Sequence, residues 1–209
     1  GALNFGSRVA RAYQDPRSQV HFDDARTYFS TGQRQYDVII SEPSNPWVSG
    51  VAGLFTQEFY GFLRGHLKPG GIGIQWLQSY ELDDPLLATM VAALIAEFPH
   101  VDAYTTNGAD LLFAVSESPL PALDYSRLKD AELELELRRL GLTGLGDFRV
   151  RQVGSRDTLG ALVALYGAVP HSDFYPVVAL NAPRARFVGA SVQSITNLAR
   201  AGMPVLELT

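Results

Sequence analysis

The segment from Ser41 to Gly50 combines residue types that can bind an amine and take a proton from it. Glu42 offers a carboxylate, Asn45 an amide oxygen, and Trp47 an indole ring whose face attracts cations. A primary amine titrates at about 10.4, so a general base such as Glu42 is needed to deprotonate it at neutral pH. The chemistry that this segment favours is attack of an amine on carbon.

Short β-branched and aromatic runs alternate with amphipathic stretches in the first two thirds of the chain, and this alternation predicts the elements that position the segment. We expect strands at Val20–Phe22, Tyr36–Ile40, Ile72–Trp76 and Leu111–Val115, and helices at Phe55–Leu67 and Leu86–Phe98. Asp83-Asp84-Pro85 provides an acidic cap and a first-turn proline at the start of the second helix. Strands that are apolar on both faces and alternate with helices indicate an α/β fold with a mostly parallel, Rossmann-like sheet.

Polar and aromatic residues follow three of the expected strands. Ligands of open parallel sheets bind beyond the carboxyl ends of the strands, so these residues are candidates for a site. Asp24 follows the first strand, where it can also cap a helix through Tyr28; Ser41 and Glu42 follow the second strand, and Tyr80 follows the third. Together they suit a ligand with an aromatic ring, ribose hydroxyls and a cationic nitrogen.

The character of the sequence changes after Ser118. We expect an α/β domain over residues 1–118 and a mainly helical section over residues 119–209 that packs on it. Its expected helices are Ser126–Leu140, Thr158–Tyr166 and Val188–Ala201, with a proline-containing loop at Pro170–Pro183. The leucines of the first of these helices alternate with charged residues, which favours a helix whose leucines face the core.

Composition and charge exclude several classes. The 209 residues include no cysteine, which excludes disulfide frameworks and thiolate metal sites, and the 4 histidines are scattered, so we expect no metal. A net charge of −5 gives no footprint for nucleic acid. The longest apolar run, Leu86–Ala96, is about half of the roughly 20 residues that cross a bilayer. We therefore expect a cytoplasmic chain that does not itself span a membrane.

Four segments carry a resemblance over about residues 9 to 115: DDARTYF at 23–29, YDVIISEPSNP at 36–46, LFTQEFY at 54–60 and LKPGGI at 67–72. In order and spacing they resemble the spermidine synthase (polyamine aminopropyltransferase) family. The resemblance implies a fold like that of class I AdoMet-dependent methyltransferases. It also implies transfer of the aminopropyl group of decarboxylated S-adenosylmethionine to an amine or polyamine, with release of methylthioadenosine. Residues 172–184 are similar to an element of spermidine-synthase-like domains, some of which are attached to membrane-spanning regions.

The resemblance assigns an amine side of the site. Glu42 stands at the family's catalytic aspartate, and Asn45 stands at a second aspartate that holds the cationic amine. Tyr104 lies near a family segment that lines the amine pocket, and we place Trp47 and Tyr80 in the same pocket. Because an amide replaces a carboxylate, recognition of the cation should be weaker than in the family, since charge-assisted hydrogen bonds are the stronger ones.

The resemblance also assigns a donor side, formed by Asp24, which would accept from the adenine amino group, with Ala25 beside it and Ser41. The chain has no Gly-x-Gly-x-x-Gly segment, so we expect the family's N-terminal part to be missing and donor binding to be impaired. The strands at Val20–Phe22 and Tyr36–Ile40 then lack their family neighbours. We expect them to pair with each other, with a second copy in a homodimer, or with a missing N-terminal portion.

Two other functions stay open. Asn45-Pro46-Trp47 is similar to the Asn-Pro-Pro-aromatic motif of N-methyltransferases, which would use S-adenosylmethionine itself as the donor, although the second proline is absent. Alternatively, the chain is a non-catalytic binding or interaction domain that keeps the fold.

Overall fold

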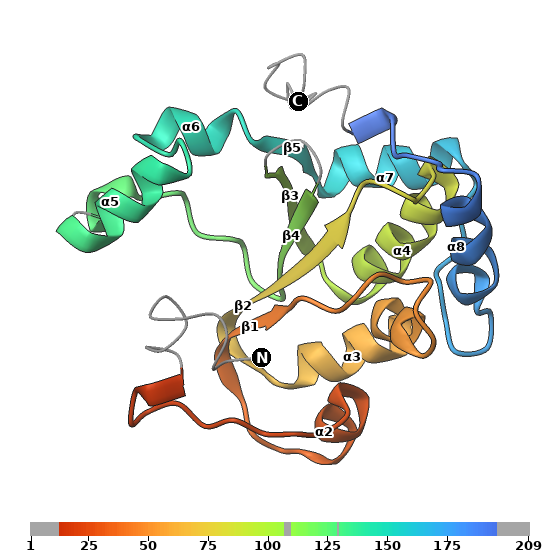
Figure 1. Ribbon diagram of the computed structural model, residues 1–209, viewed down its shortest axis with the longest axis horizontal. Coiled ribbons are helices and arrows are strands. Elements are labelled where there is room, and N and C mark those ends of the chain that lie inside the picture. Colours follow the sequence, from red (N-terminus) through yellow and green to blue (C-terminus); the bar gives the residue numbers. More distant parts are fainter. Residues whose placement is uncertain (1–12, 107–109, 129, 196–209) are drawn as a thin grey trace. The chain divides into compact units, whose positions relative to one another are not determined.

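Three of the expected apolar runs form neighbouring strands of one sheet in the computed structural model, which describes residues 13–106, 110–128 and 130–195 (Figure 1). The sheet has five strands in the order β1-β2-β4-β3-β5. Their bounds are β1 Tyr36–Ser41, β2 Leu67–Gln78, β3 His100–Thr105, β4 Asp110–Ser116 and β5 Gln152–Ser155. The α/β class is therefore confirmed, and β1 and β5 form the two edges.

The pairing of the strands corrects the expectation of a mostly parallel sheet. Only β1 and β2 are parallel, joined through η2 (Val51–Phe55) and α3 (Gln57–Gly65); β4 pairs with β2 and with β3 antiparallel, and β5 pairs with β3 antiparallel. The link between β3 and β4 is too short for the crossover that a parallel pair needs, so β4 must reverse direction. β1, β2 and β3 still point the same way, and their carboxyl ends share one edge.

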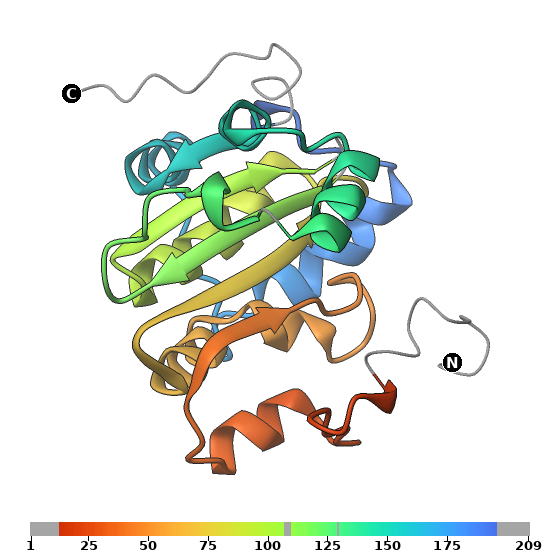
Figure 2. The same cartoon turned by 90° about the vertical axis from the view of Figure 1, so that its left-hand side faces the viewer.

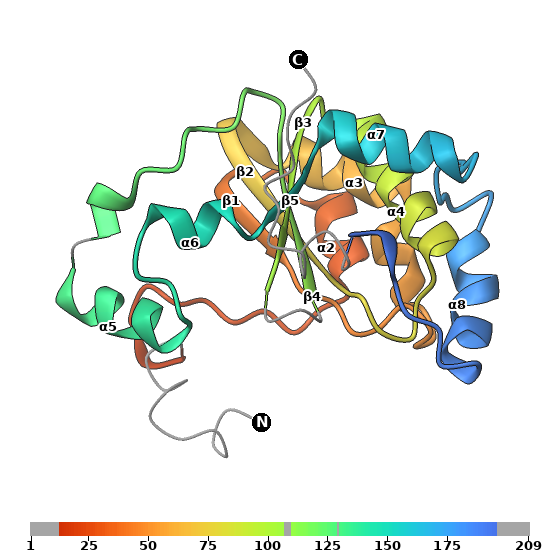
Figure 3. The ribbon, with the colours of Figure 1, turned by 90° about the horizontal axis from the view of Figure 1, so that it is seen from above.

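One face of the sheet is covered by helices. Figure 3 shows α3, α4 (Asp84–Glu97), α7 (Arg156–Leu165) and α8 (Val177–Phe187) on the same side of the strands. Every residue of α4 from Leu86 to Leu94 is buried, because this helix lies between the sheet and its helical neighbours α7 and α8. The expected acidic cap is Asp83, whose carboxylate accepts a hydrogen bond from the backbone nitrogen of Leu86 at 2.9 Å.

The other face of the sheet is more open. Ile40 is exposed, and Ile74 and Trp76 are half-buried on it. The segment with η3 (Tyr125–Leu128), α5 (Ala131–Arg139) and α6 (Leu145–Arg149) lies on this side (Figures 2 and 3). Neither α5 nor α6 has a buried residue, so the expectation of core-facing leucines over Ser126–Leu140 is wrong. Paired charges such as Glu134 and Arg138 support α5 instead.

The C-terminal section differs from its expected pattern at one helix. Thr158–Tyr166 is confirmed by α7, but α8 occupies part of the expected loop and carries Pro183 inside it. Proline usually ends a helix, which is why the sequence rule places a loop there. Residues 188–193 are not helical, and the rest of the helix expected at Val188–Ala201 lies outside the described residues from 196 on. The division at residue 118 stays a prediction.

Contacts divide the chain into two units, residues 1–32 and 33–209. The first unit contains α2 (Ala25–Thr31). Val20–Phe22 forms neither a strand nor a helix and pairs with no described strand, and the side chain of Phe22 is 97% exposed. The strand expected there is wrong, and so is its direct pairing with β1, because a strand needs a neighbour to satisfy its backbone groups. Within the described residues, no helix is both long and apolar enough to cross a bilayer.

Candidate functional site

The carboxyl ends of β1 and β2 bring the central candidate residues to one edge of the sheet. Ser41 ends β1 in register with Gln75 of β2, so the segment after Ser41 emerges beside the last residues of β2. Glu42 follows at once and is exposed, and among the described residues no ion pair or hydrogen bond holds its side chain. Its carboxylate is therefore accessible to a ligand at this edge.

The loop after Glu42 is shaped by its own backbone. The carbonyl of Asn45 accepts a hydrogen bond from the backbone nitrogen of Val48 at 2.9 Å, and Pro46 is buried. Gly50 has a φ of +82°, a conformation that residues with a Cβ rarely adopt, and it turns the chain into η2. This turn leaves the Trp47 ring half-buried beside the carboxyl edge.

The ring of Trp47 makes a cation–π contact with the side chain of Arg186. The guanidinium carbon of Arg186, in the last turn of α8, lies 5.3 Å from the centroid of a Trp47 ring. The Nε atom of Arg186 also lies 3.7 Å from a carboxylate oxygen of Glu81. The expected affinity of Trp47 for a cation is thus realised within the fold, by two residues that the sequence analysis does not single out. No local motif links Arg186 to Trp47, since the contact joins distant segments.

The segment that follows α8 crosses the end of β2. The backbone nitrogen of Val192 donates to the carbonyl of Ser79 at 2.8 Å, and Ser191 forms an isolated antiparallel bridge with Tyr80. We call residues 186–194 the strap. Tyr80, which we expect in the amine pocket, is the residue that pairs with Ser191 of the strap, and it is 44% exposed.

Tyr104 of β3 lies in the same cross-strand row of the sheet as Trp76 of β2, with β4 between the two strands. It is in register with Leu112 of β4, which pairs with Trp76 of β2. Partial burial, and after it the neighbouring carboxylate of Asp102, raises the pKa of Tyr104 to about 12. Its phenol therefore stays protonated at neutral pH and can donate a hydrogen bond at the carboxyl edge.

The expected donor-side residues divide between the two units. Ser41 is half-buried at the end of β1, whereas Asp24 and Ala25 belong to the first unit, so their place beside Glu42 stays a prediction. Asp24 caps α2, and its carboxylate accepts from the backbone nitrogen of Thr27 at 2.9 Å. That hydrogen bond lowers the pKa of Asp24, as is usual for a helix cap.

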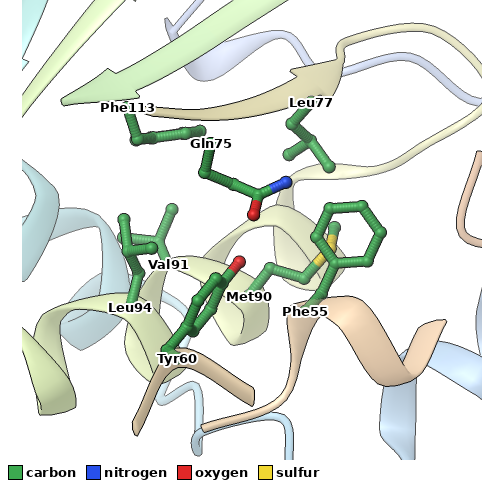
Figure 4. Close-up of a pocket in the computed structure, with 8 residues that line it drawn as sticks. All are labelled: Phe55, Tyr60, Gln75, Leu77, Met90, Val91, Leu94 and Phe113. Carbon is green, nitrogen blue, oxygen red and sulfur yellow. The ribbon is translucent and has the colours of Figure 1, made fainter. Parts of the chain in front are cut away.

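Three cavities are lined by none of the predicted site residues. One of about 10 Å³ lies in the core between the sheet, α3 and α4, where the amide of Gln75 points toward the hydroxyl of Tyr60 (Figure 4). It has room for about one water molecule. Burial raises the pKa of Tyr60. The other two, of about 370 Å³ each, lie between α4 and α8 and beside α7.

Metal ligands do not gather in the part of the chain that the structure describes: no three His, Asp or Glu side chains there form a group that could hold an ion. The chemistry available at the carboxyl edge is that of a carboxylate, an amide, a phenol and an indole.

Comparison with known proteins relates this edge to an enzyme family. A family model described as "Spermine/spermidine synthase domain" matches residues 4–108. The polyamine aminopropyltransferase of Nitrosomonas europaea is 27% identical over 173 residues, which are 79% of this chain and 50% of the relative. Polyamine aminopropyltransferase 2 of Pseudomonas aeruginosa is 33% identical over 95 residues, 44% of this chain and 27% of the relative. The chain thus spans half or less of the length of these relatives.

Among solved structures, the spermidine synthase of Thermotoga maritima superposes with a TM-score of 0.53 at 19% identity, over 78% of this chain and 55% of that chain. At this identity the likeness concerns the fold alone. It confirms a spermidine-synthase-like α/β fold, as the sequence resemblance implies.

Proposed function

Because the chain belongs to the spermine/spermidine synthase family, we propose that it supplies the amine side of a site that transfers an aminopropyl group. The observation that carries this proposal is the cation site at Trp47. A guanidinium lies over the indole at 5.3 Å, and the carboxylate of Glu81 lies 3.7 Å from the same group. A substrate ammonium has the same charge and is attracted by the same two partners.

In the proposed reaction, the lone pair of the amine attacks the aminopropyl carbon that is bonded to the sulfonium of decarboxylated S-adenosylmethionine. A C–N bond forms while the C–S bond breaks, its electrons stay on sulfur, and methylthioadenosine leaves. The nitrogen loses one proton, which Glu42 accepts, and the side-chain oxygen of Asn45 accepts a hydrogen bond from the amine. The accessible position of Glu42 after β1 supports this role.

On the donor side we propose Asp24, Ala25 and Ser41. The chain has no Gly-x-Gly-x-x-Gly segment, and we propose that it binds the nucleoside donor weakly on its own. Calorimetry with decarboxylated S-adenosylmethionine, S-adenosylmethionine and methylthioadenosine measures this directly. Micromolar affinity for any of the three would contradict the proposed impairment.

The transfer itself is tested by mass spectrometry, with decarboxylated S-adenosylmethionine and putrescine in excess and methylthioadenosine as the product. Glu42→Gln should lower the rate about 100-fold, the lower range for loss of a general base. Asp37→Asn is the matched control. Asp37 also has an exposed carboxylate, but it lies near the start of β1, where it pairs with Lys68. An unchanged rate in Glu42→Gln would overturn the role of Glu42. Methylated putrescine formed from S-adenosylmethionine would replace the proposal by N-methyl transfer.

A further inference from the structure

A side chain of this protein already occupies the cation site. Arg186 lies over Trp47 and beside Glu81, and both charged side chains remain partly in solvent, 57% exposed for Arg186 and 37% for Glu81. A dissolved cation can therefore reach the same two partners. Ion pairs this exposed contribute little to stability, so the guanidinium is held weakly enough to be displaced.

The strap ties Arg186 to the carboxyl edge through a few hydrogen bonds. Val192 donates to the carbonyl of Ser79 at 2.8 Å, and the hydroxyl of Ser194 donates to the carboxylate of Asp84 at 2.7 Å. Asp84 is the first residue of α4, and the side chain of Val192 is only 2% exposed, so the backbone of the strap is packed against the rest of the fold. The strap therefore fixes the backbone of Arg186, and its 57% exposed side chain is the part that a ligand can displace.

Two residues close to the strap in sequence register are held in unfavourable environments. Gln78, the last residue of β2, is fully buried, and neither amide atom has a hydrogen-bond partner among the described residues. Glu81, three residues further on, has a φ of +54°, the left-handed region that a residue with a side chain seldom adopts. Both flank Ser79 and Tyr80, where the strap pairs with the chain.

We propose that Arg186 is an internal stand-in for the ammonium group of the substrate, and that an amine binds by displacing the Arg186 guanidinium from between Trp47 and Glu81. The proposal rests on the proposed function in naming an amine as the displacing ligand. Arg186 thereby lowers the affinity of the site, because an amine must compete with a cation that is tethered next to it.

The test follows the fluorescence of Trp47 during titration with putrescine. The chain has 2 tryptophans, so Trp76→Phe leaves Trp47 as the single reporter. In this background, Arg186→Gln should bind putrescine about three- to five-fold more tightly, the factor for losing one exposed cation–π contact that competes with the ligand. Arg184→Gln, which removes a charge from the same last turn of α8, should leave the affinity unchanged.

Arg186→Lys keeps the charge but not the flat guanidinium, so its affinity should lie between those of wild type and Arg186→Gln. It also replaces Arg186→Gln as the test variant where the glutamine variant does not fold. Equal or weaker putrescine binding by both Arg186 variants would overturn the inference and leave the transfer proposal to the product assay. Absence of putrescine binding in every variant would overturn both. Tighter binding by Arg186→Gln without methylthioadenosine formation would support the inference and remove the transfer proposal.

Discussion

The carboxylate of Asp84, at the start of α4, accepts hydrogen bonds from both the hydroxyl and the backbone nitrogen of Ser194, at 2.7 and 3.2 Å. The backbone nitrogen of Gln193 donates to the same oxygen at 3.1 Å. A negative charge in the first turn of a helix is also favourable to the helix dipole. Asp84 thus stabilises the beginning of α4 and the end of the strap together.

We predict that Asp84→Asn lowers the free energy of unfolding by about 1–2 kcal/mol, since the hydrogen bonds from Gln193 and Ser194 then end on a neutral amide oxygen instead of a charged carboxylate. Ser194→Ala should cost about 1 kcal/mol, and the double variant should cost less than the sum, with a coupling of at least about 0.5 kcal/mol. Urea unfolding of the four proteins measures this cycle. Additive costs would mean that Asp84 and Ser194 do not interact in solution.

The strands β1 and β4 and the acidic cap of α4 are predictable because the information is local. Tyr36–Ile40 and Leu111–Val115 are continuous apolar runs, and Asp83 precedes a proline and a long apolar stretch. β3 is not among the expected strands because His100, Asp102 and Tyr104 make its alternation polar. Their partial exposure on the open face explains why the sheet accepts them.

The candidate site is predictable only where its members share a loop. Glu42, Asn45 and Trp47 lie within a few residues, so one turn brings them to the carboxyl edge. The contact of Arg186 with Trp47 depends on how α8 packs, and no periodicity or motif encodes it. For Asp24 the sequence is ambiguous, because an aspartate after an expected strand can either bind a ligand or cap a helix. In the structure Asp24 caps α2.

Gly73 in β2 is required by close packing. A Cβ atom built there would lie 2.8 Å from a methyl group of Val115 and 3.0 Å from one of Leu63. Gly73→Ala should therefore destabilise the protein by about 1–3 kcal/mol through overpacking. Gly160→Ala is the matched control: no atom lies within 4 Å of the new Cβ, and in α7 alanine should stabilise by about 0.5–1 kcal/mol. Thermal unfolding of both variants decides, and equal shifts would refute the packing argument.

His171 makes stability depend on pH. It is fully buried, with Nε2 3.0 Å from the carbonyl oxygen of Ala52, and burial lowers its pKa below the usual 6.5. The carboxylates of Asp173 and Glu58 oppose this shift without reversing it. Below about pH 6.5 the unfolded chain binds a proton that the folded protein resists, so stability is fully present above that pH and falls as pH decreases.

The contribution of His171 to the slope of the free energy of unfolding against pH should reach at most about 1.4 kcal/mol per pH unit. Urea midpoints measured from about pH 7 down to about pH 5 should fall less steeply in His171→Gln than in wild type. Parallel curves for the two proteins would show that His171 is not the responsible group.

Ile39 and Ile40, adjacent in β1, test whether the open face of the sheet is covered in solution. The side chain of Ile39 is 7% exposed and that of Ile40 is 69% exposed. For the chain alone, Ile39→Ala should cost about 2–4 kcal/mol and Ile40→Ala no more than about 0.5 kcal/mol.

The expected homodimer would cover β1 with a second copy. In that case Ile40→Ala costs more than about 1 kcal/mol, and the cost of unfolding rises with protein concentration because the dimer is linked to folding. Urea unfolding at two concentrations, with the mass in solution measured by light scattering, separates the two outcomes.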